Sequence, residues 1–178
     1  MLNRKQNMDI NLVASIERFE LIAFFAGYPV IYAIVQFIAG ERRAFAGRLA
    51  MLLPYAYALT GTLFLGLTLK NISASPLKNI TEQFQMPYLQ IWALLSVLFW
   101  TPVFSKKPVF TLLHSLIFFF LLLKDFFMYM VSYLGKDVIK NDMKMYTDSL
   151  LLNAGTMAIV ALLHFIWSGI RGNKKISV

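Results

Sequence analysis

Long apolar runs separated by shorter polar stretches dominate the chain. Five runs could form membrane-spanning helices: Leu21–Ala39, Leu49–Leu69, Tyr88–Phe104, Val109–Leu134 and Ser149–Gly169. A helix needs about 20 residues to cross a hydrocarbon core roughly 30 Å thick, with about 17 residues as the lower limit. The third run lies at that limit. The pattern predicts an all-α fold, a polytopic transmembrane helical bundle with about five spans.

Helices are the only secondary structure that fits these runs. An open strand edge in lipid would leave backbone amides unpaired, and a closed barrel would show shorter alternating segments. Pro29, Pro54 and Pro102 lie inside or near the ends of three runs. Because proline removes a backbone donor, each of them predicts a kink.

The predicted transmembrane domain covers residues 21–170, between two polar ends. In residues 1–20, Ile10, Val13, Ile16 and Phe19 recur at roughly helical spacing. This spacing predicts a short amphipathic helix on the membrane interface, with a solvated tail as the alternative. Residues 171–178 form a basic C-terminal tail.

Composition agrees with a membrane location. Hydrophobic residues make up 58% of the chain and charged residues 15%, whereas soluble domains carry about 25% charge. The net charge of +8 comes from basic residues between apolar runs. Basic residues in such positions set the orientation of the spans and contact lipid headgroups. We therefore expect the lipid bilayer as a partner, and no nucleic acid. The absence of cysteine excludes disulfides, thiolate metal sites and a cysteine nucleophile.

The density of basic residues indicates an orientation. Both sides of a five-span bundle would carry the same number of lysines and arginines, but one side holds them in short segments. These are Arg42, Arg43 and Arg48, then Lys106 and Lys107, then Arg171, Lys174 and Lys175. Short basic connections favour the cytoplasmic side. We expect a cytoplasmic C-terminus and an outside N-terminus in a bacterial inner or plasma membrane.

Ionisable residues inside spans are rare and are candidates for function. The fourth run contains His114, Lys124 and Asp125, and the fifth contains His164, with Asn153 as a further polar residue. His114 and Asp125 are eleven residues apart, as are Asn153 and His164. At 100° per residue, each of these pairs shares one face of its helix. If the runs pack as an antiparallel hairpin, His114 faces His164 and Asp125 faces Asn153.

Several interpretations of this polar cluster stay open. The aromatic residues after Asp125 favour an interfacial belt, with Lys124 reaching outward, and the cluster could also be structural glue. Facing histidines could instead ligate haem b, although large side chains crowd the place. A histidine–aspartate relay could move protons or bind a quinone headgroup. No metal site or catalytic motif is recognisable, which leaves a lipid-modifying enzyme as a weaker alternative.

Small residues at helical spacing predict close helix packing. The second run offers Ala58, Thr62 and Gly66, and the fifth offers Ala154, Ala158 and Ala161. Such stripes let helices approach closely within a chain or between chains.

These patterns favour a small multi-pass membrane protein that is a non-catalytic subunit or accessory of a larger membrane assembly. Its expected partners are other membrane-protein subunits or further copies of itself, and no cofactor is predicted. The alternative is a redox (haem b or quinone) or proton-conducting membrane subunit that uses His114 and His164. A lipid-modifying membrane enzyme is the second alternative.

Overall fold

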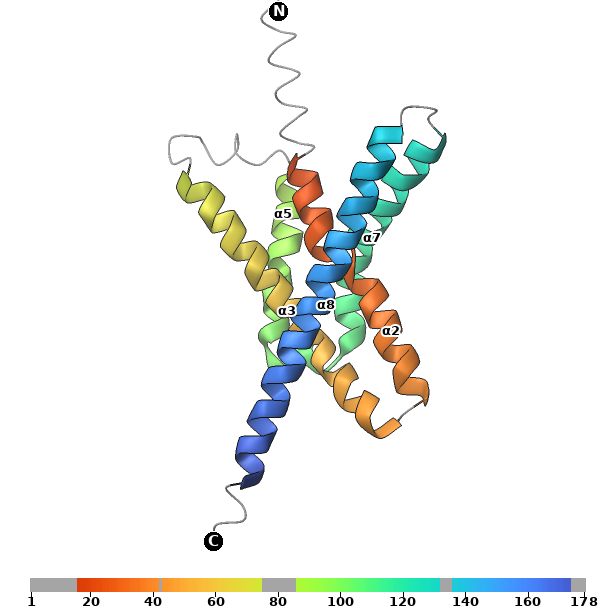
Figure 1. Cartoon of the computed structure of the whole chain (residues 1–178). Helices are drawn as coiled ribbons and strands as arrows, with labels where there is room; N and C mark the ends of the chain where they lie inside the picture. Colours follow the sequence, from red (N-terminus) through yellow and green to blue (C-terminus); the bar gives the residue numbers. More distant parts are fainter. Residues whose placement is uncertain (1–15, 42, 75–85, 132–135, 174–178) are drawn as a thin grey trace, which may run out of the picture.

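A computed structural model describes residues 16–41, 43–74, 86–131 and 136–173 of the chain. All regular elements in this part are helical. They are residues 16–25, α2 (Tyr28–Glu41), α3 (Arg43–Ala74), α5 (Pro87–Leu94), the 3₁₀ helix η1 (Leu95–Trp100), α6 (Pro102–Ser105), α7 (Pro108–Val131) and α8 (Lys136–Asn173). Figure 1 shows them as one bundle. The predicted helical bundle is confirmed.

Four helical stretches are long and apolar enough to cross a membrane: Ile16–Ile38, Gly47–Ala74, Pro108–Met128 and Met143–Ile170. Their outward faces carry many large apolar side chains, such as Phe37, Met51, Phe120 and Leu163, with 61–72% of their surface exposed. A soluble protein rarely exposes so extensive an apolar surface. The chain is therefore membrane-embedded.

The run expected as the third span forms a shorter pass. Its apolar helix covers Pro87–Trp100 and ends in the 3₁₀ turns of η1. This helix is roughly 24 Å long, less than the hydrocarbon core. Thr101 has extended backbone angles because it precedes Pro102, the first residue of α6. Within the described residues the chain thus runs five times along the bundle, and four of these stretches are long enough to span a membrane.

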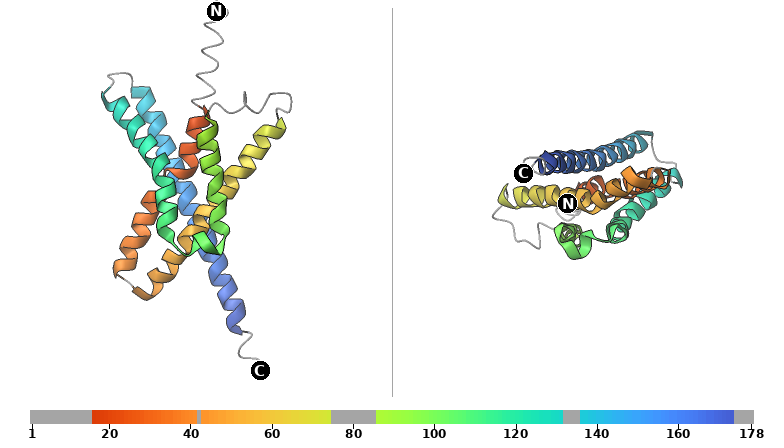
Figure 2. Two further views of the ribbon diagram at one scale, coloured as in Figure 1. Left: turned by 180° about the vertical axis from the view of Figure 1, so that it is seen from behind. Right: turned by 90° about the horizontal axis from the view of Figure 1, so that it is seen from below.

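The passes are arranged in three layers, as the end-on view of Figure 2 shows. Helix α8 forms one outer layer, and α5 and α7 form the other. The first span and α3 lie between them. The middle layer therefore separates α8 from α7 along most of their length, although these helices follow each other in the chain.

Two boundaries differ from the sequence-based expectation. Residues 16–20, assigned to the N-terminal interfacial segment, already belong to the first span. The remainder of that segment, residues 1–15, lies outside the described residues. Residues 136–148, expected in a loop, are the first turns of α8. Because α8 starts so early, α7 meets its beginning: the rings of Phe126 and Tyr146 lie 6.2 Å apart.

Aromatic side chains fill the centre of the bundle. Phe25 of the first span stacks on Phe118 of α7, with ring centroids 4.9 Å apart, and meets Phe64 of α3 edge-on at 5.4 Å. The rings of Tyr28 and Tyr57 lie beside them, with their centroids 4.4 Å apart. Such ring pairs add to the packing between spans, where apolar burial alone gives little because lipid is equally apolar.

Candidate functional site

The first span is broken at Ala26 and Gly27, just before Pro29. Proline has no backbone N–H and disrupts the helix before it. Two side chains of α8 bind the backbone groups near this break. The Gly27 N–H donates to Ser149 Oγ at 2.8 Å, and Asn153 Nδ2 donates to the Phe24 carbonyl at 3.0 Å. Ser149 and Asn153 thus act as a clamp on the break.

This contact is close enough to require glycine. A Cβ atom on Gly27 would lie 2.6 Å from the Ser149 carbonyl oxygen, which is backbone and cannot rotate away. Gly27 belongs to none of the sequence patterns that predicted close helix packing. The neighbouring Pro29 was the available signal, since a proline break exposes backbone groups that another helix must approach.

Asp125 does not pair with Asn153. Instead its carboxylate accepts a hydrogen bond from Arg18 of the first span, with 2.6 Å between Arg18 Nη2 and Asp125 Oδ1. Both side chains are about one quarter exposed. The predicted Asp125–Asn153 pair is wrong because the early start of α8 shifts the register and the first span supplies both partners.

A second carboxylate of the first span caps α5. Glu17 is buried and accepts hydrogen bonds from the Met86 N–H at 3.2 Å and from Gln90 Nε2 at 2.9 Å. Met86 is the N-cap residue of α5 and makes no cap through its own side chain. A carboxylate at the N-terminus of a helix accepts hydrogen bonds from the free N–H groups and interacts favourably with the positive end of the helix dipole. Glu17 therefore fixes the start of the short pass.

His114 lies in an aromatic enclosure. Its Nδ1 is 2.7 Å from the Tyr57 hydroxyl, and its ring stacks on Trp92 with centroids 4.6 Å apart and 8° between the planes. The Trp92 Nε1–H donates to the His114 carbonyl at 3.1 Å. Rings of Phe99 and Phe118 complete the enclosure. His114 Nε2 is buried and has no hydrogen-bond partner among the described residues.

His164 lies elsewhere. Residues 162–170 of α8 are all exposed, and this part of the helix extends beyond the lower end of α7 in Figure 1. His114 is 93% buried between α3, α5 and α7, so the two histidines do not form the predicted facing pair. Lys124 is exposed on α7. Apart from the chain neighbours Lys124 and Asp125, no two members of the predicted polar cluster make contact in the hydrogen bonds and ion pairs of the described residues.

The predicted small-residue stripes have mixed environments. Ala58 is fully buried, but Thr62, Gly66, Ala154 and Ala158 are exposed, and Ala161 is half-buried. Helices α3 and α8 instead meet at Thr60 and Thr156, whose hydroxyl oxygens are 3.2 Å apart. The close approach of α3 to η1 occurs at Gly61, where a Cβ would clash with Ser96.

The polar groups of the interior therefore connect elements. The ion pair joins the first span to α7, Glu17 joins it to α5, and the clamp joins it to α8. Tyr28 and Thr111 add a second link between the first span and α7, with their hydroxyls 2.6 Å apart. No group of three His, Asp or Glu side chains that could hold a metal ion occurs within the described ranges.

No protein-family model, curated protein or solved structure matches the chain.

Proposed function

We propose that this chain is a non-catalytic subunit or accessory of a larger membrane assembly, and that the exposed end of α8 contacts another subunit. The observation that carries the proposal is the position of His164. It lies within the apolar span Met143–Ile170, on a segment whose residues 162–170 are all exposed. Polar and ionisable side chains in spans almost always face protein or water. A neighbouring subunit would supply that cover.

The use of the interior polar groups supports a structural role. The side chains of Asp125, Asn153 and Glu17 bind other elements of the same bundle. Hydrogen bonds of this kind hold transmembrane helices in register. They are not arranged as a nucleophile with a base, which a lipid-modifying enzyme would need.

The redox alternative is less well supported. A bis-histidine haem would need His114 and His164 on opposite sides of one porphyrin, whereas one is enclosed by Tyr57 and Trp92 and the other is exposed on α8. The same separation weakens a direct relay between them. A haem held by His114 alone would have to displace the stacked Trp92 ring or approach the buried Nε2 atom.

Photocrosslinking tests the proposed contact. A photoreactive amino acid at Leu163 of α8 is compared with the same residue at Phe120 of α7, since both side chains are 61% exposed. In native membranes we expect protein adducts at position 163 and lipid adducts at position 120. Lipid adducts alone at both positions would refute the proposed contact, and mass spectrometry of the adducts identifies the partner or a second copy of this chain.

We also propose that the C-terminus lies in the cytoplasm and the N-terminus outside, because the short segments on the C-terminal side are dense in lysine and arginine. The four candidate spans together with the short helix Pro87–Trp100 make five passes if the short helix also crosses, and five passes put the two ends on opposite sides. A phosphatase fused after Val178 should be inactive, whereas a fluorescent protein at that place should be bright. The reverse pattern would overturn the orientation without affecting the proposed contact at α8.

A further inference from the structure

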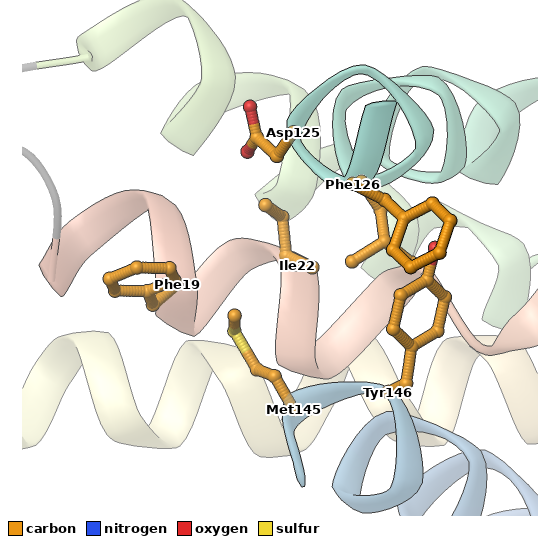
Figure 3. Close-up of a pocket in the computed structure, with 7 residues that line it drawn as sticks. Phe19, Ile22, Asp125, Phe126, Met145 and Tyr146 are labelled. Atoms are coloured by element: carbon orange, nitrogen blue, oxygen red, sulfur yellow. The ribbon is translucent and has the colours of Figure 1, made fainter. Parts of the chain in front are cut away.

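A hollow lies between the first span, α7 and α8 at the end of the bundle that is opposite to His164. Its inner part is narrow, with a volume of about 10 Å³, and is lined mainly by apolar side chains; they are Phe19, Ile22, Leu122, Phe126, Met145 and Tyr146, with Asp125 as the polar member. Figure 3 shows Phe19, Met145 and Phe126 around this space. The wider outer part, of about 220 Å³, is lined by Phe19, Met145, Lys144 and Asp148.

The limits of the candidate spans place the hollow at the level of the membrane interface. Three spans end beside it: Ile16–Ile38 begins there, Pro108–Met128 finishes there and Met143–Ile170 begins there. Phospholipid headgroups occupy this level, and their acyl chains begin just below it. The outer part places the apolar side chains of Phe19 and Met145 beside the charged Lys144 and Asp148, which matches the junction of acyl chain and headgroup in a phospholipid.

The charges at the opening have both signs. Asp125 is already neutralised by Arg18 at 2.6 Å. Lys144 and Asp148 are exposed, one helical turn apart on α8, and make no ion pair in the part of the chain that the structure describes. A cation and an anion held 4 residues apart on one helix face lie about 6 Å from each other. A zwitterionic group can meet both at once.

We propose that this hollow is a binding site for a zwitterionic phospholipid with a primary ammonium, such as phosphatidylethanolamine. Its phosphate pairs with Lys144 and its ammonium donates to Asp148. The start of an acyl chain packs against Phe19 and Met145. An anionic lipid without the ammonium would satisfy Lys144 but would leave Asp148 facing a phosphate, and like charges repel.

Native mass spectrometry of the full chain in neutral detergent tests the site. Phosphatidylethanolamine and phosphatidylglycerol with identical acyl chains are titrated separately. We expect one phosphatidylethanolamine to bind first and more tightly. Lys144→Gln and Asp148→Asn should each weaken it about fivefold, the effect of about 1 kcal/mol per headgroup charge contact. Lys106→Gln is the control, because Lys106 is an exposed lysine at the other end of α7.

A third variant tests the apolar part. Met145→Trp fills the hollow and should abolish the first binding event, while an unchanged melting temperature shows that the bundle remains folded. Equal or tighter binding of phosphatidylglycerol would overturn the zwitterionic site. So would a Lys144 or Asp148 variant that binds like the Lys106 control, or a folded Met145 variant that binds normally.

Discussion

At the scale of single residues, glycines and small polar side chains decide how closely the helices approach. Gly27 allows the clamp residues Ser149 and Asn153 to reach a broken segment of the first span. Gly66, which the sequence places in a stripe of small residues, has no atom within 4 Å of the position that a Cβ would take. Gly27 thus cannot be replaced by a larger residue without a clash, whereas Gly66 can. The difference comes only from the helix that lies beside each glycine.

Gly27→Ala should destabilise the folded bundle. Its Cβ would lie 2.6 Å from a backbone oxygen of α8, so the helices must separate, at a cost of about 1–3 kcal/mol. Thermal unfolding in detergent, followed by tryptophan fluorescence, measures the loss. Gly66→Ala is the matched control and should be neutral or stabilising by up to about 1 kcal/mol, since alanine favours a helix interior. Equal effects of the two variants would contradict the close contact.

At the residue scale, Tyr57→Phe also gives a specific expectation. It removes the hydroxyl that is 2.7 Å from His114 Nδ1 and leaves that nitrogen unpaired in the interior. We expect a loss of about 0.6–1.7 kcal/mol, the range of hydrogen bonds between transmembrane helices. Tyr55→Phe on the same helix is the control, because the Tyr55 hydroxyl makes only a 3.3 Å contact with Ser105. If Tyr57→Phe costs no more than Tyr55→Phe, the His114 contact contributes little.

At the scale of elements, the first span is the common partner of the other helices. Glu17 binds the start of α5, Arg18 binds α7, and the region around Gly27 binds α8. The apolar spacing in residues 1–20 predicted an interfacial segment, and a segment outside the bundle offers Asp125 no partner. The charged residues just before an apolar run were the available signal for such a partner.

The ion pair between Arg18 and Asp125 should stabilise the contact between the first span and α7. Because both side chains are only about one quarter exposed, the contribution lies between that of surface and buried pairs, about 1–2 kcal/mol. Arg18→Asp and Asp125→Arg should each lower the melting temperature. The double variant, which restores opposite charges, should recover most of the loss. Additive effects in the double variant would show that the two residues do not interact.

At the scale of the whole molecule, the order of the layers differs from the order of the helices in the chain. The sequence predicts a hairpin of the last two spans because they are consecutive. The structure instead places the first span and α3 between α7 and α8 over most of their length (Figure 2). Contact between the last two spans remains near their connection, where Phe126 meets Tyr146.

A disulfide pair tests this arrangement. Thr60→Cys with Thr156→Cys should crosslink α3 to α8 under mild oxidation, because the two hydroxyl oxygens are 3.2 Å apart and the chain has no other cysteine. Asp125→Cys with Asn153→Cys, the pair expected from the hairpin, should not. For each cysteine pair, the chain is cleaved between the two spans, and electrophoresis shows whether the fragments stay joined by the disulfide. Efficient crosslinking of the second pair alone would favour the hairpin and refute the layered packing.

The sequence by itself determined the membrane location and the helical class. Every backbone group in lipid must be paired within its own segment, so a long apolar run has to be a helix whatever its neighbours are. The same logic marked the third run as short, which the structure confirms in Pro87–Trp100.

Only the tertiary structure decided which polar residues meet. A helix that is rotated or shifted by a few residues presents a different face, and the shift depends on where a break or a turn occurs. The early start of α8 and the break at Gly27 moved Asn153 to the Phe24 carbonyl and left Asp125 to Arg18. Local sequence cannot fix these positions, because they follow from packing between segments that are more than 100 residues apart.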